Sequence, residues 1–206
     1  MEAIRLTDPE YYGHLRDYAV EQQLAGRPWA QTRQGLFINI RTYSEALYAD
    51  LASAPEKDLI EYYGAEGAFA RELQAMDMRL CADFAMGNLD LRPPLGTRME
   101  YQANRISISR LTTAKAARDR PHSHRPPTEA DVVAVYQSML RRGASEDQAS
   151  TFLRQGVQMM SLDDRCTTTI AYYEAVLDQP TARAARLIAA DMRANAEISM
   201  ADPSPR

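Results

Sequence analysis

The stretch "LFINIRTYSEALYADL", residues 36–51, places apolar side chains four, three, four and four residues apart. This spacing sets them on one face of an α-helix, because such a helix turns once every 3.6 residues. A stripe of this kind is typical of a helix that packs against a core. The stretch therefore predicts a fold built from amphipathic helices. The stripe consists of Leu36, Ile40, Tyr43, Leu47 and Leu51.

Helical spacing also runs along the rest of the N-terminal half, where Gly64 and Gly67 are expected to bend or interrupt one helix. The alternation in "RISISRL", residues 105–111, would also fit a short strand. The helix is favoured because the pattern is long and no second strand is available for pairing. The prolines of "NLDLRPPLG", residues 88–96, predict a loop. The expected helices cover residues 9–25, 36–51, 56–86 and 97–118.

Three helix starts of one type follow in the C-terminal half, at Thr128, Ser145 and Ser161. Each places a hydroxyl three residues before an acid or amide, which is the pattern that caps a helix. Pro180 opens a last helix. The sum is an all-α bundle of about eight helices with little or no sheet. We expect a single domain over residues 1–206, in which two helical halves (1–118 and 128–200) flank a connector rich in proline, histidine and arginine.

Composition limits the classes of function. The formal charge of −4, without a concentrated basic helix, argues against nucleic-acid binding. No apolar run reaches the ~18–20 residues that a membrane span needs. The N-terminus lacks the basic and apolar segments of a signal peptide, so the cytoplasm is the expected location. The alternative is a periplasmic or secreted chain whose signal has been removed.

The two cysteines, Cys81 and Cys166, each lie within a helical pattern. Buried free thiols are the favoured interpretation, because neither cysteine has the spacing of a zinc or redox motif. The alternative is a Cys81–Cys166 disulfide in an oxidising compartment.

Two of the three histidines lie in "RPHSHRPP", residues 120–127. The prolines favour a polyproline II backbone, which repeats every three residues, so His122 and His124 are expected on different sides of a solvated connector. Arg120 and Arg125 flank the pair, which makes a cationic contact loop a second interpretation. A metal site through the two imidazoles is the weaker alternative.

Tyrosine is unusually frequent, with eleven tyrosines against four phenylalanines and one tryptophan. Three doublets, Tyr11-Tyr12, Tyr62-Tyr63 and Tyr172-Tyr173, each predict one ring toward the core and one at the rim. Tyrosine, tryptophan and arginine are enriched where proteins bind one another. The partner-binding candidates are therefore Tyr12, Trp29, Tyr62, Tyr172, Arg120 and Arg125.

The sequence contains no nucleophile elbow, no phosphate-binding loop and no dinucleotide fingerprint. No cofactor is therefore expected. We expect a non-enzymatic protein that binds another protein, of the kind exemplified by an adaptor, a secretion-associated chaperone or an immunity-type inhibitor. The alternative is an enzyme with a site assembled from distant residues, dependent on a metal held by His122 and His124.

Overall fold

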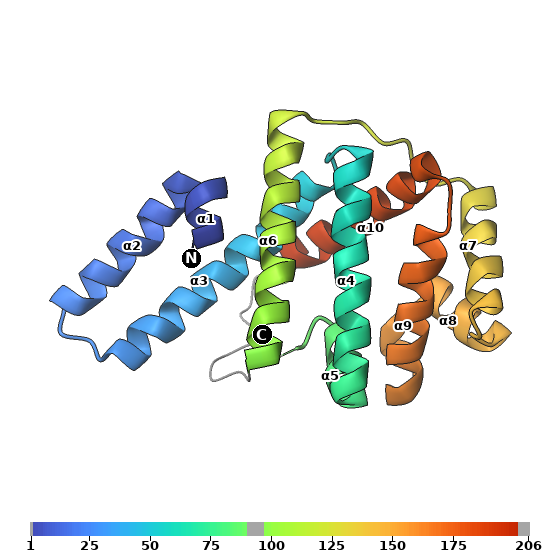
Figure 1. Ribbon diagram of the computed structural model, residues 1–206, viewed down its shortest axis with the longest axis horizontal. Coiled ribbons are helices and arrows are strands. Elements are labelled where there is room, and N and C mark those ends of the chain that lie inside the picture. The colour runs from blue at the N-terminus through green and yellow to red at the C-terminus, as the bar shows by residue number, and fades with distance from the viewer. Residues whose placement is uncertain (1, 90–96, 202–206) are drawn as a thin grey trace.

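The computed structural model describes residues 2–89 and 97–201, and within these ranges the chain forms ten α-helices, one 3₁₀ turn and no strand (Figure 1). The all-α prediction is confirmed. The elements are α1 (Glu2–Thr7), α2 (Pro9–Leu24), α3 (Trp29–Leu51), α4 (Glu56–Met76), α5 (Met78–Ala85), α6 (Thr97–Asp119), α7 (Glu129–Arg141), α8 (Glu146–Gln155), η1 (Val157–Met159), α9 (Leu162–Leu177) and α10 (Thr181–Ala201).

The helix starts predicted from capping residues are confirmed. The side chains of Thr128 and Ser145 each accept a hydrogen bond from a backbone amide three residues ahead, and each completes a capping box. Ser161 caps α9 in the same way, although without the reciprocal bond of a capping box. Asp8 caps α2 by accepting from the amide of Tyr11. These bonds satisfy amides that have no partner inside the helix.

The predicted helix over residues 56–86 is two helices, and the break lies at Asp77 rather than at either glycine. Asp77 has an extended backbone (φ −164°, ψ 125°), and its carboxylate accepts from the amide of Arg79, which starts α5. Gly64 and Gly67 both lie inside α4. The short helix α1 was not expected, and most of the predicted loop at 88–96 falls outside the described residues.

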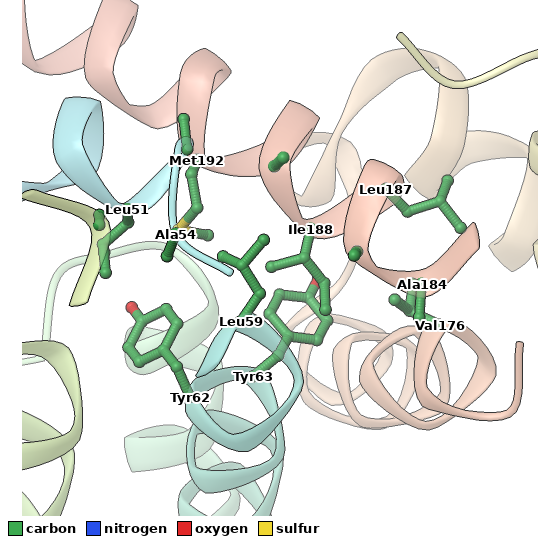
Figure 2. Packing of buried hydrophobic residues seen from close by; sticks show 14 of the residues in the cluster. Leu51, Ala54, Leu59, Tyr62, Tyr63, Val176, Ala184, Leu187, Ile188 and Met192 are labelled. Carbon is green, nitrogen blue, oxygen red and sulfur yellow. The ribbon is translucent and has the colours of Figure 1, made fainter. Parts of the chain in front are cut away.

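Helix α4 lies at the centre of the body, in contact with α5, α6, α9 and α10, while α3 packs against α6 and α10 (Figure 1). In the core, Leu59 of α4 points toward Ile188 of α10, and Leu51 of α3 lies nearby (Figure 2). All three side chains are fully buried. One core therefore contains residues from both sides of the connector.

Cys81 of α5 and Cys166 of α9 form a disulfide, which is the alternative to the free thiols that the sequence favoured. Their Cα atoms are 5.2 Å apart, and both residues are fully buried. They lie in a second apolar cluster with Phe69, Leu73 and Ile170. The bond ties the short helix α5 to the C-terminal half of the fold.

Helix α2 and the first half of α3 form an antiparallel hairpin that projects from the body (Figure 1). We call residues 9–40 the arm. Within it only Leu15 and Thr32 are buried. The arm is therefore a two-helix extension with little core of its own. No helix in the described part of the chain is long and apolar enough to cross a membrane.

Candidate functional site

The tip of the arm presents two large apolar side chains to solvent. Leu24, the last residue of α2, is 84% exposed, and Trp29, the first residue of α3, is 57% exposed. Every residue from 23 to 31 is exposed. Other large apolar side chains of this protein are also exposed, but Leu24 and Trp29 lie at the two ends of one projecting turn, which makes the tip a candidate interaction site.

The turn that carries these side chains is held by hydrogen bonds. Gly26 adopts a left-handed conformation (φ 71°), and its amide donates to the carbonyl of Gln23 at 3.0 Å. The amide of Arg27 donates to the carbonyl of Gln22, also at 3.0 Å. This pair of bonds is a Schellman motif, which closes the end of α2. The side chain of Gln23 also donates to Thr32 of α3 at 3.0 Å, so the two helices are joined next to the tip.

The tip is cationic. Residues 22–44 include three arginines and no aspartate or glutamate. Arg27 and Arg33 are exposed, and neither forms an ion pair within the described part of the chain. Several arginines of the body are paired, as for Arg118 with Asp8 at 3.1 Å. Arg27 and Arg33 therefore keep their hydrogen-bond donors available to a partner, whereas Arg16, the third arginine of the arm, pairs with Asp17.

The base of the arm is fastened to the body by a polar cluster. The rings of Tyr11 and Tyr43 stack with centroids 3.8 Å apart, and the hydroxyl of Tyr43 donates to Asp8 at 2.6 Å. Arg118 of α6 donates to the same carboxylate. Burial alone would raise the pKa of Asp8, but hydrogen bonds from Tyr43, the Tyr11 amide and Arg118 lower it. Asp8 is therefore ionised at neutral pH, and its bonds fix the direction of the arm.

The base of the arm also contains a protonated tyrosine, Tyr11, and a groove next to it. Burial, with the nearby Tyr43 and Asp8, raises the pKa of Tyr11 to about 12, so its hydroxyl keeps its proton and donates to the carbonyl of Asn39. A groove of about 400 Å³ lies beside the stacked rings, between α2 and α3.

Two of the tyrosines predicted to bind a partner do not face outward. Tyr62 is fully buried and donates to Glu66, so its assignment to a binding surface is wrong. Tyr172 is partly buried and donates to Asp191 at 2.8 Å. Tyr12 is partly buried and packs against the main core. A tyrosine doublet leaves one ring exposed only where its helix has a solvent-facing side, and α4 is in contact with other helices on several sides. Among the predicted aromatic anchors, Trp29 is the exposed one.

The buried tyrosines belong to two polar networks inside the body. Glu66 accepts hydrogen bonds from Tyr173 at 3.0 Å and from Arg110 at 3.0 Å, in addition to that from Tyr62. These bonds satisfy a buried carboxylate, which would otherwise be costly.

The second network is centred on Asp191, which accepts from Tyr63 at 2.6 Å and from Tyr172. Burial raises the pKa of Asp191 to about 6, and the hydrogen bonds from the two tyrosines oppose that rise. Neither Glu66 nor Asp191 lines the groove at the base of the arm or a second groove, which lies beside the connector. The two networks join helices within the core.

Most residues of the connector are exposed, as expected of a solvated spacer, but the connector is also hydrogen-bonded to the body. The amide of His122 donates to the carbonyl of Ser53 at 2.7 Å, and the ring of the buried His124 bonds the carbonyl of Ala54 at 2.8 Å. Arg193 of α10 donates to the carbonyl of His124 at 3.1 Å. The expectation that the imidazoles lie on different sides is wrong, since their ring centroids are 4.8 Å apart. Contacts with the α3–α4 turn override the local preference of the prolines.

A groove of about 580 Å³ lies between the connector, α3 and α10, and His122, Arg193 and Glu197 line it. Among the described residues no group of three or more His, Cys, Asp or Glu side chains could hold a metal ion. Arg125 is exposed, and Arg120 lies 3.5 Å from Asp58. The groove thus combines both signs of charge without a set of metal ligands.

Comparison with protein-family models, with curated proteins and with solved structures finds no match to this chain.

Proposed function

We propose that the protein acts by binding another protein through the tip of the arm. The observation that carries the proposal is the position of Leu24 and Trp29, exposed at the hydrogen-bonded end of a hairpin that projects from the body. A non-enzymatic binding role of the adaptor, chaperone or inhibitor type fits this geometry.

The energetics of the tip support the proposal. Burying a leucine side chain completely is worth roughly 1.5–3 kcal/mol, and an aromatic side chain can bury about 150–250 Å². Leu24 and Trp29 would contribute most of such a gain on binding, because both are mainly exposed in the free protein. The polar residues around them, Gln23, Arg27 and Gln31, would form the rim that surrounds the centre of an interface. The hydrogen-bonded turn reduces the cost of ordering the tip when a partner binds.

A retention experiment with matched variants tests the proposal. The arm variant is Leu24→Ser/Trp29→Ser, and the control is Val133→Ser/Met159→Ser, at two exposed apolar positions of the body. Each protein is immobilised and exposed to an extract of the cells that make it. The wild type and the control should retain a partner protein that the arm variant does not retain. All three proteins should melt at similar temperatures, because the substituted side chains are exposed.

Two results would contradict the proposal. One is retention of the same species by the arm variant, and the other is a wild type that retains no species at all.

A further inference from the structure

We infer that the surface recognised by the arm is an acidic surface of a partner protein, with an apolar pocket that receives Leu24 and Trp29. This inference rests on the proposed binding function and adds the chemistry of the partner.

The distribution of charge is the first argument. Residues 22–44 carry +3, and the whole chain carries −4, so subtraction leaves −7 for the rest of the protein. This acid-free segment therefore has the opposite sign of charge to the rest of the chain, while the arm as a whole is neutral, because Glu10, Asp17 and Glu21 of α2 balance its three arginines. Complementary charge across an interface increases the rate of association and selects the correct partner.

The placement of the arginines is the second argument. Arg33 follows Trp29 by four residues on α3, so the two side chains share one side of that helix. Arg27 lies in the turn between Leu24 and Trp29. Each apolar anchor thus has a guanidinium group close to it in the chain. A guanidinium binds a carboxylate through two parallel hydrogen bonds, which makes aspartate and glutamate the matching groups on a partner.

The absence of internal partners is the third argument. Arg110 pairs with Glu66 at 3.0 Å, and Arg142 pairs with Asp178. Arg27 and Arg33 form no ion pair among the described residues, and some exposed arginines of the body, such as Arg154, also form none. The charges of Arg27 and Arg33 do not contribute to holding the described fold together, and they are available for recognition.

An anionic membrane is a weaker candidate for the same chemistry. Attraction to an anionic lipid surface is worth about 1 kcal/mol per arginine, and lipid-binding segments typically cluster four to eight basic residues. Residues 22–44 contain only three arginines. A partner protein can combine fewer charges with a shaped apolar pocket, so it fits the tip better.

Trp29 makes the inference directly measurable, because it is the only tryptophan of the chain. The probes are two synthetic amphipathic helical peptides with the same leucine face, one with glutamates on its polar face and the other with lysines. The glutamate peptide should shift the Trp29 emission to shorter wavelength and saturate, while the lysine peptide should not. Raising the salt from about 50 mM to about 500 mM should weaken the binding, because the Debye length shortens.

Matched variants test the role of the arginines. The variant Arg27→Gln/Arg33→Gln should bind the glutamate peptide roughly tenfold more weakly than the wild type, which corresponds to about 1.4 kcal/mol of binding free energy. The control Arg79→Gln/Arg154→Gln, at two exposed arginines of the body, should bind as the wild type does. These four substitutions leave Trp29 in place, so the same signal reports on every protein.

Several results would overturn the inference. They are equal binding of the two peptides, no shift with either, or unchanged binding by the arm arginine variant. A shift of Trp29 that grows with protein concentration alone, together with a dimer in sedimentation, would make a second copy the occupant. A shift of the Trp29 emission with anionic vesicles, but with neither peptide, would identify a membrane as the occupant of the tip. If the retention experiment succeeds and the peptides fail, only the acidic partner is rejected; if retention fails, the proposed function is rejected too.

Discussion

Removal of the Cys81–Cys166 disulfide should lower the free energy of unfolding by several kcal/mol. The bond joins residues 85 apart in sequence, and it links α5 to α9 across an apolar cluster. A disulfide restricts the unfolded chain, and the restriction grows with the length of the loop that it closes. For this loop, the chain-entropy relation gives a stabilisation of about 4.6 kcal/mol at 25 °C. Small domains are stable by only about 5–15 kcal/mol in total, so the bond is a large part of the stability.

The assay is urea unfolding of three samples: the oxidised protein, the protein with a reductant, and the Cys81→Ala/Cys166→Ala variant. The reduced protein and the variant should both unfold at much lower urea than the oxidised protein. The variant should be slightly less stable than the reduced protein, because alanine leaves a small cavity where each buried sulfur was.

Thiol titration of the denatured, non-reduced protein gives an independent measurement and should find no free thiol. Two free thiols in that titration, or a loss of less than about 1 kcal/mol on reduction, would refute the reasoning, since engineered and native disulfides typically contribute about 2–4 kcal/mol. A bonded pair in protein isolated from its own cells would favour the periplasmic or secreted interpretation over the cytoplasmic one, because disulfides persist in oxidising compartments.

Two further predictions concern the body. Gly67→Ala should destabilise the fold by roughly 1–3 kcal/mol, because the new Cβ would lie 3.1 Å from Cβ of Tyr173. Gly64→Ala, in the same helix with no atom within 4 Å, should stabilise by roughly 0.5–1 kcal/mol, and equal urea midpoints for the two variants would contradict this. Burial raises the pKa of Asp191 from 3.8 to about 6, so the folded state binds the proton more tightly and the wild type should lose stability as pH rises through that window. Asp191→Asn should lack this loss, and identical slopes of melting temperature against pH would argue against it.

The features predicted correctly from the sequence are local ones. Helical periodicity depends on neighbours within two turns, and a capping hydroxyl bonds an amide three residues away. Thr128, Ser145 and Ser161 could therefore be recognised as helix starts without knowledge of the fold. "RISISRL" was correctly assigned to a helix, because a strand there would need a partner strand and the described chain has none.

The features that were missed depend on contacts between distant segments. Tyr62 is buried because α4 has helices on several sides, which its own sequence pattern does not reveal. The two imidazoles of the connector lie close together because Ser53 and Ala54, about seventy residues earlier, bind the connector backbone and the His124 ring. The break at Asp77 had a local signal that was overlooked, since an aspartate followed by a renewed helical pattern is a capping site.

The second half of the arm has one signal in the sequence, the acid-free run of residues 22–44 in an acidic chain. The geometry of the arm also gives a physical reason to look for a partner. Ordering a residue costs roughly 1–2 kcal/mol in backbone entropy, and burial of apolar surface must offset that cost. The arm orders residues 9–40, yet only Leu15 and Thr32 are fully buried, and four further residues (Tyr11, Tyr12, Leu36 and Ile40) are partly buried against the core, so the arm adds little to the core for its length. A short connection would close the same body at lower cost. A hairpin fastened at its base, closed by hydrogen bonds at its tip and left with Leu24 and Trp29 in water is therefore better explained by contacts with a partner than by the stability of the free protein.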